Sequence, residues 1–363
     1  MKTQLWRLAG NEEDGRKLRE AAALLRNGEV VAFPTETVYG LGANGLDADA
    51  VRRIFAAKGR PADNPLILHI AEKNEIKDLA SGLTPNAIAL AEAFWPGPLT
   101  LVIKSSGVVP DEVTAGLDTV AVRMPNHEVA RELIRLAGCP LAAPSANKSG
   151  RPSPTKAQDV LEDMDGLIAG ILDGGGCAIG VESTVVDTTL PVPMILRPGG
   201  ITREMLEEVV GAVGLDPALE SDKEAVPRAP GMKYRHYAPK APMYLLVGRD
   251  ADIHLARLAQ LLTSRGVKVG IVTDEKDAFA ALPEGLAEVK TYGGLLPVLA
   301  GKLYQWLREF DRAGVAVILA KGVPENGLGL AVMNRLRKAA GNNVLLAEGQ
   351  NLLVQSGTRP DII

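Results

Sequence analysis

Six cationic side chains stand where the chain changes direction, at the ends of apolar runs or in segments rich in Gly, Pro and Ser. They are Lys58, Arg60, Arg123, Lys148, Arg151 and Arg197. A charge-assisted hydrogen bond to a phosphate is worth about 1.5–3 kcal/mol, so several of them together hold a triphosphate. Because the chain carries a net charge of −4, this placement predicts a local anion-binding cleft rather than a basic coat for duplex nucleic acid.

Two of these cations lie in the stretch Pro144–Thr155, which reads PSANKSGRPSPT. Proline fixes φ and removes an N–H donor, and Ser and Asn prefer turns, so the stretch predicts a stiff polar loop. The apolar run Leu136–Ala143 leads into it and predicts a strand that delivers the loop to a sheet edge. Its hydroxyl, amide and ammonium groups suit an anionic ligand; a solvated surface loop is the alternative.

The remaining cations each allow two interpretations. Lys58 and Arg60 stand where a predicted helix ends, so they either converge on a polyanion or complement the helix dipole. Arg123 lies inside an apolar strand, where a bare cation is costly, so an internal carboxylate or a bound anion must satisfy it. Arg197, which also follows an apolar run, likewise needs an internal carboxylate or a bound anion. Ser183 follows a glycine-rich segment and is either a ligand contact or a turn hydroxyl.

Several common kinds of site are absent from the sequence or disfavoured by it. Gly40–Gly45 matches the G-x-G-x-x-G dinucleotide fingerprint, but Pro34 ends the preceding strand too early for the glycines to follow it directly. The chain has no G-x-x-x-x-G-K-[ST] phosphate loop. Its four histidines are scattered without ligand spacing, and His69, within an apolar strand, fits a core histidine. Two cysteines, with no signal-peptide or membrane-spanning run, indicate a cytoplasmic location.

A length of 363 residues predicts two domains. Short strands and helices alternate through residues 1–213, and residues 214–242, rich in proline, read as a linker. Residues 243–363 again alternate, with strands near 243–247, 267–273 and 315–320 between helices. This spacing is typical of βαβ units with a parallel sheet.

An ordered set of motifs resembles the YrdC-like threonylcarbamoyl-AMP synthases in their long, two-domain form. The motifs are Pro34–Gly42 (PTETVYGLG), Lys58–Pro61 (KGRP), Asn64–Leu66 (NPL), Trp95–Thr100 (WPGPLT), Pro144–Asn147 (PSAN) with Ser149-Gly150, Glu182–Asp187 (ESTVVD) and Gly231–Pro239 (GMKYRHYAP). The resemblance implies an α/β fold: a YrdC-like twisted mixed sheet with flanking helices over 1–213, a linker over 214–242 that covers the active site, and a smaller Rossmann-like parallel α/β domain over 243–363.

The resemblance also implies a reaction. Such enzymes join L-threonine, bicarbonate and ATP, with Mg²⁺ on the phosphates, and release pyrophosphate and threonylcarbamoyl-AMP. The product serves the threonylcarbamoyladenosine modification of tRNAs that read codons beginning with A, through a downstream threonylcarbamoyl transferase complex. Weak contact with tRNA and no membrane partner are expected.

Carried over residue by residue, the family's tetrad falls on four residues of this chain. They are Lys58, Arg60, Ser145 and Asn147. The implied L-threonine site comprises Thr35, His69, Arg123, Ala143 and Ser183. The implied ATP site comprises Lys58, Arg60, Asn64, Thr119, Ser145, Asn147, Ser153, Arg197 and Tyr237, with Tyr234 as the alternative linker tyrosine.

Two other functions compete with this one. An RNA-binding or regulatory protein could use the same basic cleft for RNA phosphates, although few aromatics for base stacking and the negative net charge disfavour it. A carbamoyltransferase acting through carbamoyl-adenylate is the second. The zinc-finger and acylphosphatase segments expected of such hydrogenase-maturation enzymes are absent from the sequence.

Overall fold

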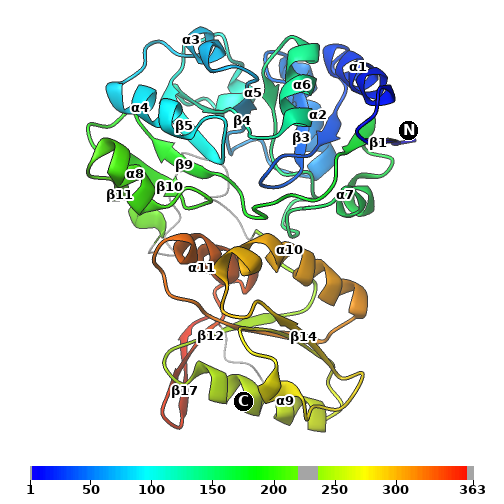
Figure 1. Cartoon of the computed structure of the whole chain (residues 1–363), viewed down its shortest axis with the longest axis vertical. Helices are drawn as coiled ribbons and strands as arrows, with labels where there is room; N and C mark the ends of the chain where they lie inside the picture. The colour runs from blue at the N-terminus through cyan, green and yellow to red at the C-terminus, as the bar shows by residue number, and fades with distance from the viewer. Residues whose placement is uncertain (1, 220–235, 358–363) are drawn as a thin grey trace. The chain divides into compact units, whose positions relative to one another are not determined.

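The computed structural model describes residues 2–219 and 236–357 of the chain. They form two units, one of residues 1–149 and 153–234 and the other of residues 150–152 and 235–363. Each unit is built on its own twisted sheet (Figure 1).

The first unit contains an eleven-stranded mixed sheet within the described residues. In spatial order its strands are β1 (Gln4–Arg7), β8 (Gly170–Asp173), β2 (Val31–Phe33), β3 (Gly40–Asn44), β7 (Leu141–Ala142), β4 (Ile67–His69), β6 (Thr119–Arg123), β5 (Leu99–Lys104), β9 (Thr184–Asp187), β10 (Met194–Arg197) and β11 (Gly214–Leu215). The sheet contains both parallel and antiparallel pairs, so the expected mixed sheet is confirmed.

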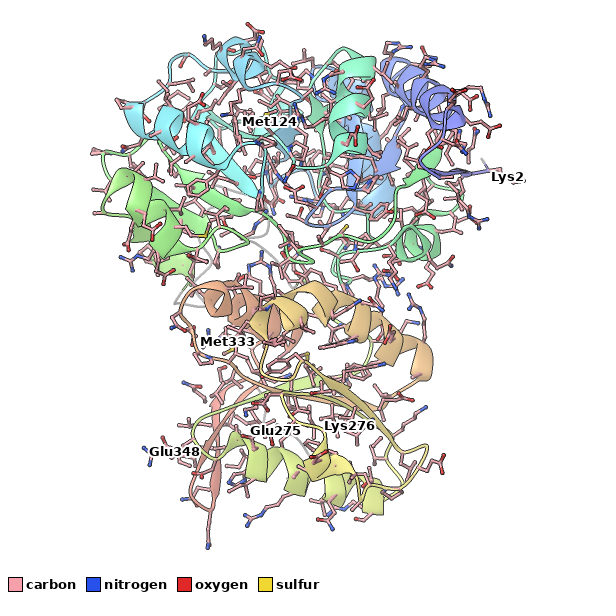
Figure 2. All side chains as sticks on the ribbon, in the orientation of Figure 1. Lys2, Met124, Glu275, Lys276, Met333 and Glu348 are labelled. Atoms are coloured by element: carbon pink, nitrogen blue, oxygen red, sulfur yellow. The ribbon has the colours of Figure 1, made fainter. Side chains whose placement is uncertain are left out.

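Helices cover both faces of this sheet. They are α1 (Glu13–Arg26), α2 (Ala48–Lys58), α3 (Ile76–Leu79), α4 (Pro85–Phe94), α5 (Asp111–Thr114), α6 (Glu128–Ala137), α7 (Ala157–Met164) and α8 (Arg203–Val210), with the 3₁₀ turns η1 (Lys73–Glu75) and η2 (Pro217–Leu219). Helices α1 and α6 lie side by side over one core, while α2, α4, α7 and α8 enclose the other (Figure 1). The side chain of Met124, labelled in Figure 2, lies in the second of these cores directly after β6.

Local sequence explains why the helix before Lys58 begins and ends where it does. The Asp47 carboxylate accepts hydrogen bonds from the backbone N–H groups of Asp49 and Ala50, which caps the N-terminus of α2. Gly59 adopts φ 60° and ends the helix in a left-handed turn. The helix predicted over 47–58 is thereby confirmed, and its last residue is Lys58.

The polar, glycine-bearing segment Thr35–Gly42 runs into a strand that the sequence pattern had not indicated, because Gly40–Asn44 forms β3. A Cβ on Gly42 would lie 2.7 Å from Cε1 of Phe33, so the glycines let that ring lie flat against the neighbouring strand. Three glycines within or just after a strand cannot form the phosphate-binding turn of a dinucleotide site.

Other boundaries also differ from expectation. In the run Leu136–Ala143 only Leu141–Ala142 is a strand, because α6 continues to Ala137 and Gly138, at φ 70°, turns the chain. The strand expected over Gly166–Leu172 begins at Gly170. The first residues of the predicted linker are ordered elements, since β11 pairs with β10 and η2 follows it.

The second unit has a six-stranded sheet within the described residues, parallel except for its last strand, which confirms the expected fold class. In spatial order its strands are β14 (Ala287–Thr291), β13 (Val269–Thr273), β15 (Val317–Lys321), β12 (Met243–Val247), β16 (Val344–Glu348) and β17 (Asn351–Ser356). Its helices are α9 (Ala251–Ser264), α10 (Leu296–Ala313) and α11 (Leu328–Ala339), with the 3₁₀ turn η3 (Asp277–Phe279). The sequence pattern had not indicated β14, β16 or β17.

Candidate active site

Arg123 stands at the carboxyl end of β6, between two strands that bring polar side chains beside it. In the parallel pair β4·β6 it lies opposite His69, and in the antiparallel pair β5·β6 it lies opposite Thr100. Its side chain is buried, with 4% of its surface exposed. The strand register therefore gathers a cation, an imidazole and a hydroxyl that are far apart in the sequence.

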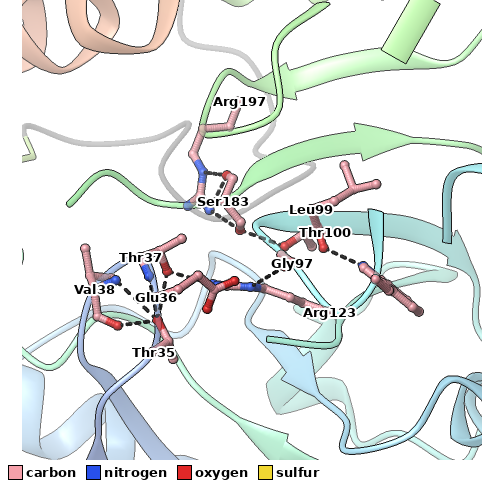
Figure 3. A network of polar contacts seen from close by, with 11 residues as sticks. Thr35, Glu36, Thr37, Val38, Gly97, Leu99, Thr100, Arg123, Ser183 and Arg197 are labelled. Atoms are coloured by element: carbon pink, nitrogen blue, oxygen red, sulfur yellow. Dashed lines mark hydrogen bonds and ion pairs between the residues drawn. The ribbon is translucent and has the colours of Figure 1, made fainter. Parts of the chain in front are cut away.

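The Arg123 guanidinium has three partners in the described structure (Figure 3). Nη1 donates to Oγ1 of Thr37 at 2.9 Å, and Nε donates to the carbonyl of Gly97 at 3.4 Å. Nη2 lies 2.7 Å from Oε2 of Glu36, which is itself only 8% exposed. Of the two partners expected for this cation, the structure therefore contains the internal carboxylate.

Thr35 joins the same network through Thr37. The two hydroxyls lie 2.9 Å apart, and Thr35 donates to the carbonyl of Val38 at 2.7 Å. Its Oγ1 also accepts from the backbone N–H groups of Thr37 and Val38. These local bonds fix the turn that presents Thr35, Glu36 and Thr37 to Arg123.

Ser183 lies near Arg123 through its contact with Thr100, the residue opposite Arg123 in the β5·β6 pair. Its Oγ lies 2.8 Å from Oγ1 of Thr100. Arg197 donates through Nη2 to Oγ of Ser183 at 3.1 Å and holds the Ser183 carbonyl with Nε and Nη2. The β9·β10 register shifts between Ile195 and Arg197, and such a bulge re-aims the side chain that follows it. Arg197, predicted for ATP, thus contacts a residue predicted for threonine.

His69 is buried beside Arg123. Burial, reinforced by the nearby guanidinium, lowers the pKa of His69 to about 3, so the imidazole is neutral at neutral pH. Its Nδ1 lies 3.2 Å from the carbonyl of Ile67. Ala143 lies beside the same strand, since its backbone N–H donates to Ile67. Of the predicted threonine set, Thr35 and Arg123 share one hydrogen-bonded network through Thr37. Ser183 is bonded to Thr100, which lies opposite Arg123 in the sheet, and His69 and Ala143 flank these residues.

A second cluster joins the end of α2 to the polar loop. Lys58 Nζ donates to the carbonyl of Ser145 at 2.5 Å and of Asn147 at 2.7 Å, and the Lys58 carbonyl accepts from the backbone N–H of Ser149. Burial lowers the pKa of Lys58 well below its usual range, and the charge of Arg60 adds to this effect. Lys58, Ser145 and Asn147 of the predicted tetrad are therefore in direct contact. Arg60, the fourth member, is close enough for its charge to lower the pKa of Lys58.

Arg60 contacts another predicted nucleotide residue, because its Nη2 donates to the carbonyl of Asn64 at 3.0 Å. Thr119 begins β6 and so lies about 13 Å from Arg123, at 3.3 Å per strand residue. It does not join the Arg123 network. Ser153 donates to Oε1 of Glu182 at 2.6 Å, directly before Ser183 in the chain.

The remaining predicted residues fall elsewhere. Tyr237 belongs to the second unit, where its ring stacks on Tyr304 with centroids 5.1 Å apart. Tyr234 lies outside the described residues. Lys148 is exposed, and Arg151 belongs with residues 150–152 of the second unit.

Sequence reasoning missed Glu36, Thr37, Thr100 and Glu182 as parts of the site. All four lie inside motifs that had been noticed for other members. A search for the carboxylate that Arg123 needs would have found Glu36, since it lies in the polar segment after β2.

The described residues contain no cluster of three or more His, Cys, Asp or Glu side chains able to hold a metal ion. The site combines buried cations, hydroxyls and amides, which suit carboxylate and phosphate groups, with the buried carboxylates of Glu36 and Glu182. No helix in the described part of the chain is long and apolar enough to span a membrane.

Comparisons with known proteins identify the family to which each half of the chain is similar. Residues 23–199 match the Sua5/YciO/YrdC family, described as telomere recombination, and residues 201–341 match the C-terminal domain of threonylcarbamoyl-AMP synthase. The fold and the motifs thus define a YrdC-like domain followed by a Sua5-type C-terminal domain.

Relatives resemble nearly the whole chain. A threonylcarbamoyl-AMP synthase of Pyrococcus abyssi is 52% identical, over 91% of this chain and 95% of its own length. One of Bacillus subtilis is 49% identical, over 95% of this chain and 100% of its own. The crystal structure of P. abyssi Sua5 complexed with L-threonine is 50% identical, with a TM-score of 0.89 over 96% of this chain and 100% of that one. The chain belongs to the threonylcarbamoyl-AMP synthase family.

Proposed function

We propose that this chain forms L-threonylcarbamoyl-adenylate and pyrophosphate from L-threonine, bicarbonate and ATP, as a nucleotidyltransferase. The observation that carries the proposal is the buried Arg123–Thr37–Thr35 network, with Ser183 bonded to the neighbouring Thr100, in the same unit as the Lys58–Ser145–Asn147 cluster. The first suits a small amino acid and the second a nucleotide. The names of the relatives and the threonine complex of the P. abyssi protein support the assignment.

In the proposed mechanism, the chain positions reactants and neutralises charge. Arg123 binds the carboxylate of threonine, with the hydroxyls of Thr35 and Ser183 beside it. The threonine amine and bicarbonate give a carbamate with loss of water. A carbamate oxygen then attacks the α-phosphorus of ATP, and the bond to pyrophosphate breaks. Because the carbamate is the nucleophile, orientation and electrostatic stabilisation supply the acceleration.

Lys58, Arg60 and Arg197 supply the positive charge for the nucleotide. Lys58 now donates to two loop carbonyls, and the developing charge on phosphate is a stronger acceptor than either of them. Ser145, Asn147, Ser153 and Asn64 provide neutral contacts. Mg²⁺ would enter with ATP and would neutralise part of the charge on its phosphates.

We further propose that the product is passed, in the cytoplasm, to a downstream threonylcarbamoyl transferase complex. There it modifies tRNAs that read codons beginning with A, with at most weak contact between this chain and tRNA.

Mass spectrometry of the product tests the proposal. With ATP, bicarbonate and isotope-labelled threonine, we expect one adenylate that carries the label, and pyrophosphate release only when both threonine and bicarbonate are present. Pyrophosphate release that ignores either compound would overturn the proposal.

The competing RNA-binding function needs cations that reach the phosphates of a polymer. Lys58, Arg123 and Arg197 are only 4–6% exposed, so small ligands that enter a pocket suit them better. A filter-binding titration separates the two functions, since the proposed enzyme binds ATP and lacks tight, salt-sensitive binding of RNA.

A further inference from the structure

Glu36 is a buried carboxylate whose oxygens have no aligned hydrogen bond among the described residues. Only 9% of its side chain is exposed, and both Oε1 and Oε2 are buried without a hydrogen-bond donor. Oε2 lies 2.7 Å from Nη2 of Arg123, which is an ion-pair distance, yet the two atoms lack the alignment of a hydrogen bond. A buried carboxylate normally accepts several hydrogen bonds, so Glu36 retains capacity for a donor.

This carboxylate works against the binding of a simple acid. Arg123 is the cation proposed for the threonine carboxylate, and Glu36 already neutralises it. A ligand that carried only a carboxylate would bring a second anion to one buried cation, and like charges at such distances repel strongly where water is excluded. The ion pair is therefore poorly suited to a carboxylic acid as such.

The same ion pair matches a ligand that carries both charges. The zwitterion of an α-amino acid places its carboxylate against Arg123 and its ammonium against Glu36, which gives two opposite-charge contacts and adds no net charge to the ion pair. The nearby Cys177 thiol does not add a negative charge, because burial raises its pKa to about 12.

Figure 3 shows Glu36 reaching toward the Arg123 guanidinium from the Thr35–Val38 segment, beside the hydroxyl of Thr37. The turn that Thr35 fixes by hydrogen bonds to Val38 places the Glu36 side chain there. A ligand carboxylate on the guanidinium thus has its α-substituent within reach of the glutamate.

We propose that Glu36 is the acceptor for the α-ammonium group of the amino-acid substrate, so that the Glu36–Arg123 pair selects zwitterionic amino acids over carboxylic acids of the same shape. The inference rests on the proposed function, since it takes the Arg123 network as the amino-acid site. A buried group that needs a donor rejects analogues without one far more strongly than an apolar pocket rejects a missing methyl group.

The test compares two ligands in two proteins by isothermal titration calorimetry. The ligands are L-threonine and (R)-3-hydroxybutanoate, which is threonine without its amino group; the proteins are the full chain and its Glu36→Gln variant. We expect the variant to bind threonine about 10–100-fold more weakly, the loss of one charged hydrogen bond. Its affinity for 3-hydroxybutanoate should stay the same or increase.

A matched control is Glu92→Gln on α4, where the glutamate is exposed and pairs with Lys73. It should leave both affinities unchanged. If Glu36→Gln does not fold, Glu36→Asp keeps the charge with a shorter reach, and threonine alone should bind more weakly.

Two results overturn the inference. Equal weakening of both ligands would make Glu36 a structural partner of Arg123, and equal affinities in variant and wild type would deny it any contact with substrate. A wild-type chain that binds no threonine would instead overturn the proposed function together with this inference.

Discussion

At the scale of single residues, Arg123 is the side chain with the most demanding geometry. Its three nitrogens each have a different partner, namely Gly97, Thr37 and Glu36. A lysine offers one ammonium on a flexible stem and cannot reproduce the planar fork of a guanidinium. A lysine at position 123 would keep the charge balance with Glu36, but it would not orient a bound carboxylate as arginine does.

We therefore expect Arg123→Lys to fold and to raise the KM for threonine about tenfold or more, with the KM for ATP changed less than about twofold. Steady-state pyrophosphate release measures both constants. The control Arg203→Lys alters an exposed arginine that pairs with Glu207 on α8 and should change neither. If both KM values rose together, Arg123 would not be assigned to threonine.

His69 gives a prediction about pH. Its folded pKa of about 3 lies below the unfolded value near 6.5, so the unfolded chain binds more protons between these two values. Stability from neutral His69 is full above about pH 6.5 and falls by up to about 1.4 kcal/mol per pH unit as pH decreases toward 3. Urea unfolding at about pH 7 and about pH 5 should show a smaller decrease for His69→Gln than for wild type. Identical decreases would mean that His69 protonates freely in the fold.

At the scale of elements, Ser183 is positioned by backbone packing as much as by hydrogen bonds. A Cβ on Gly199 would lie 2.3 Å from the backbone nitrogen of Thr184 and 2.4 Å from the carbonyl oxygen of Glu182. The turn after β10 therefore lies directly on the backbone that enters β9, and only glycine permits this approach.

We expect Gly199→Ala to displace the segment around Ser183, to destabilise the fold by about 1–3 kcal/mol and to weaken threonine binding. Gly15→Ala is the matched control, because its new methyl group meets only the Arg19 side chain at 3.5 Å on the exposed side of α1. It should stabilise the chain by about 0.5–1 kcal/mol with unchanged binding. Thermal unfolding and calorimetric titration provide the two measurements, and unaffected threonine binding in Gly199→Ala would contradict this role.

The elements also show how far the sequence could be used. Periodicity and capping predicted α2 and α6 closely, because the signals are local: Asp47 before one helix, and glycine after both. β3 was missed because its glycines are typical of loops. The reason for them is that a side chain there would clash with the Phe33 ring on the paired strand, and the sequence does not show this contact. β1 was missed because Trp6 is its one buried residue. The tetrad could be located from its motif, but the ion pair of Glu36 with Arg123 joins the segment after β2 to β6, and these two strands are not neighbours in the sheet.

At the scale of the whole molecule, the chain has separate cores. The clusters around Leu68 and Leu133 belong to the first unit, and that around Leu255 to the second. Yet the polar loop is divided, since residues 150–152 belong to the second unit. There Arg308 donates to the carbonyl of Pro152 at 2.6 Å, and the N–H of Ala238 donates to the carbonyl of Gly150 at 2.8 Å.

This division predicts what a fragment of residues 1–219 will do. Its sheet and both cores are complete, so we expect cooperative urea unfolding and threonine affinity within about twofold of the full chain. Residues 150–152 lose their partners in such a fragment, and they stand between Asn147 and Ser153 of the proposed ATP site. Calorimetry should therefore show ATP affinity reduced about tenfold or more, because a freed loop must be ordered on binding.

The point variant Arg308→Lys in the full chain isolates the same effect without removing a domain. It keeps the charge but replaces the planar donor that holds Pro152, so it should weaken ATP binding and leave threonine binding intact. Lys302→Arg, an exposed change on the same helix α10, is the control. If both the fragment and Arg308→Lys bound ATP as tightly as the full chain, residues 150–152 would not need their contacts with Arg308 and Ala238 for ATP binding. The role of that unit would then have to lie outside nucleotide binding.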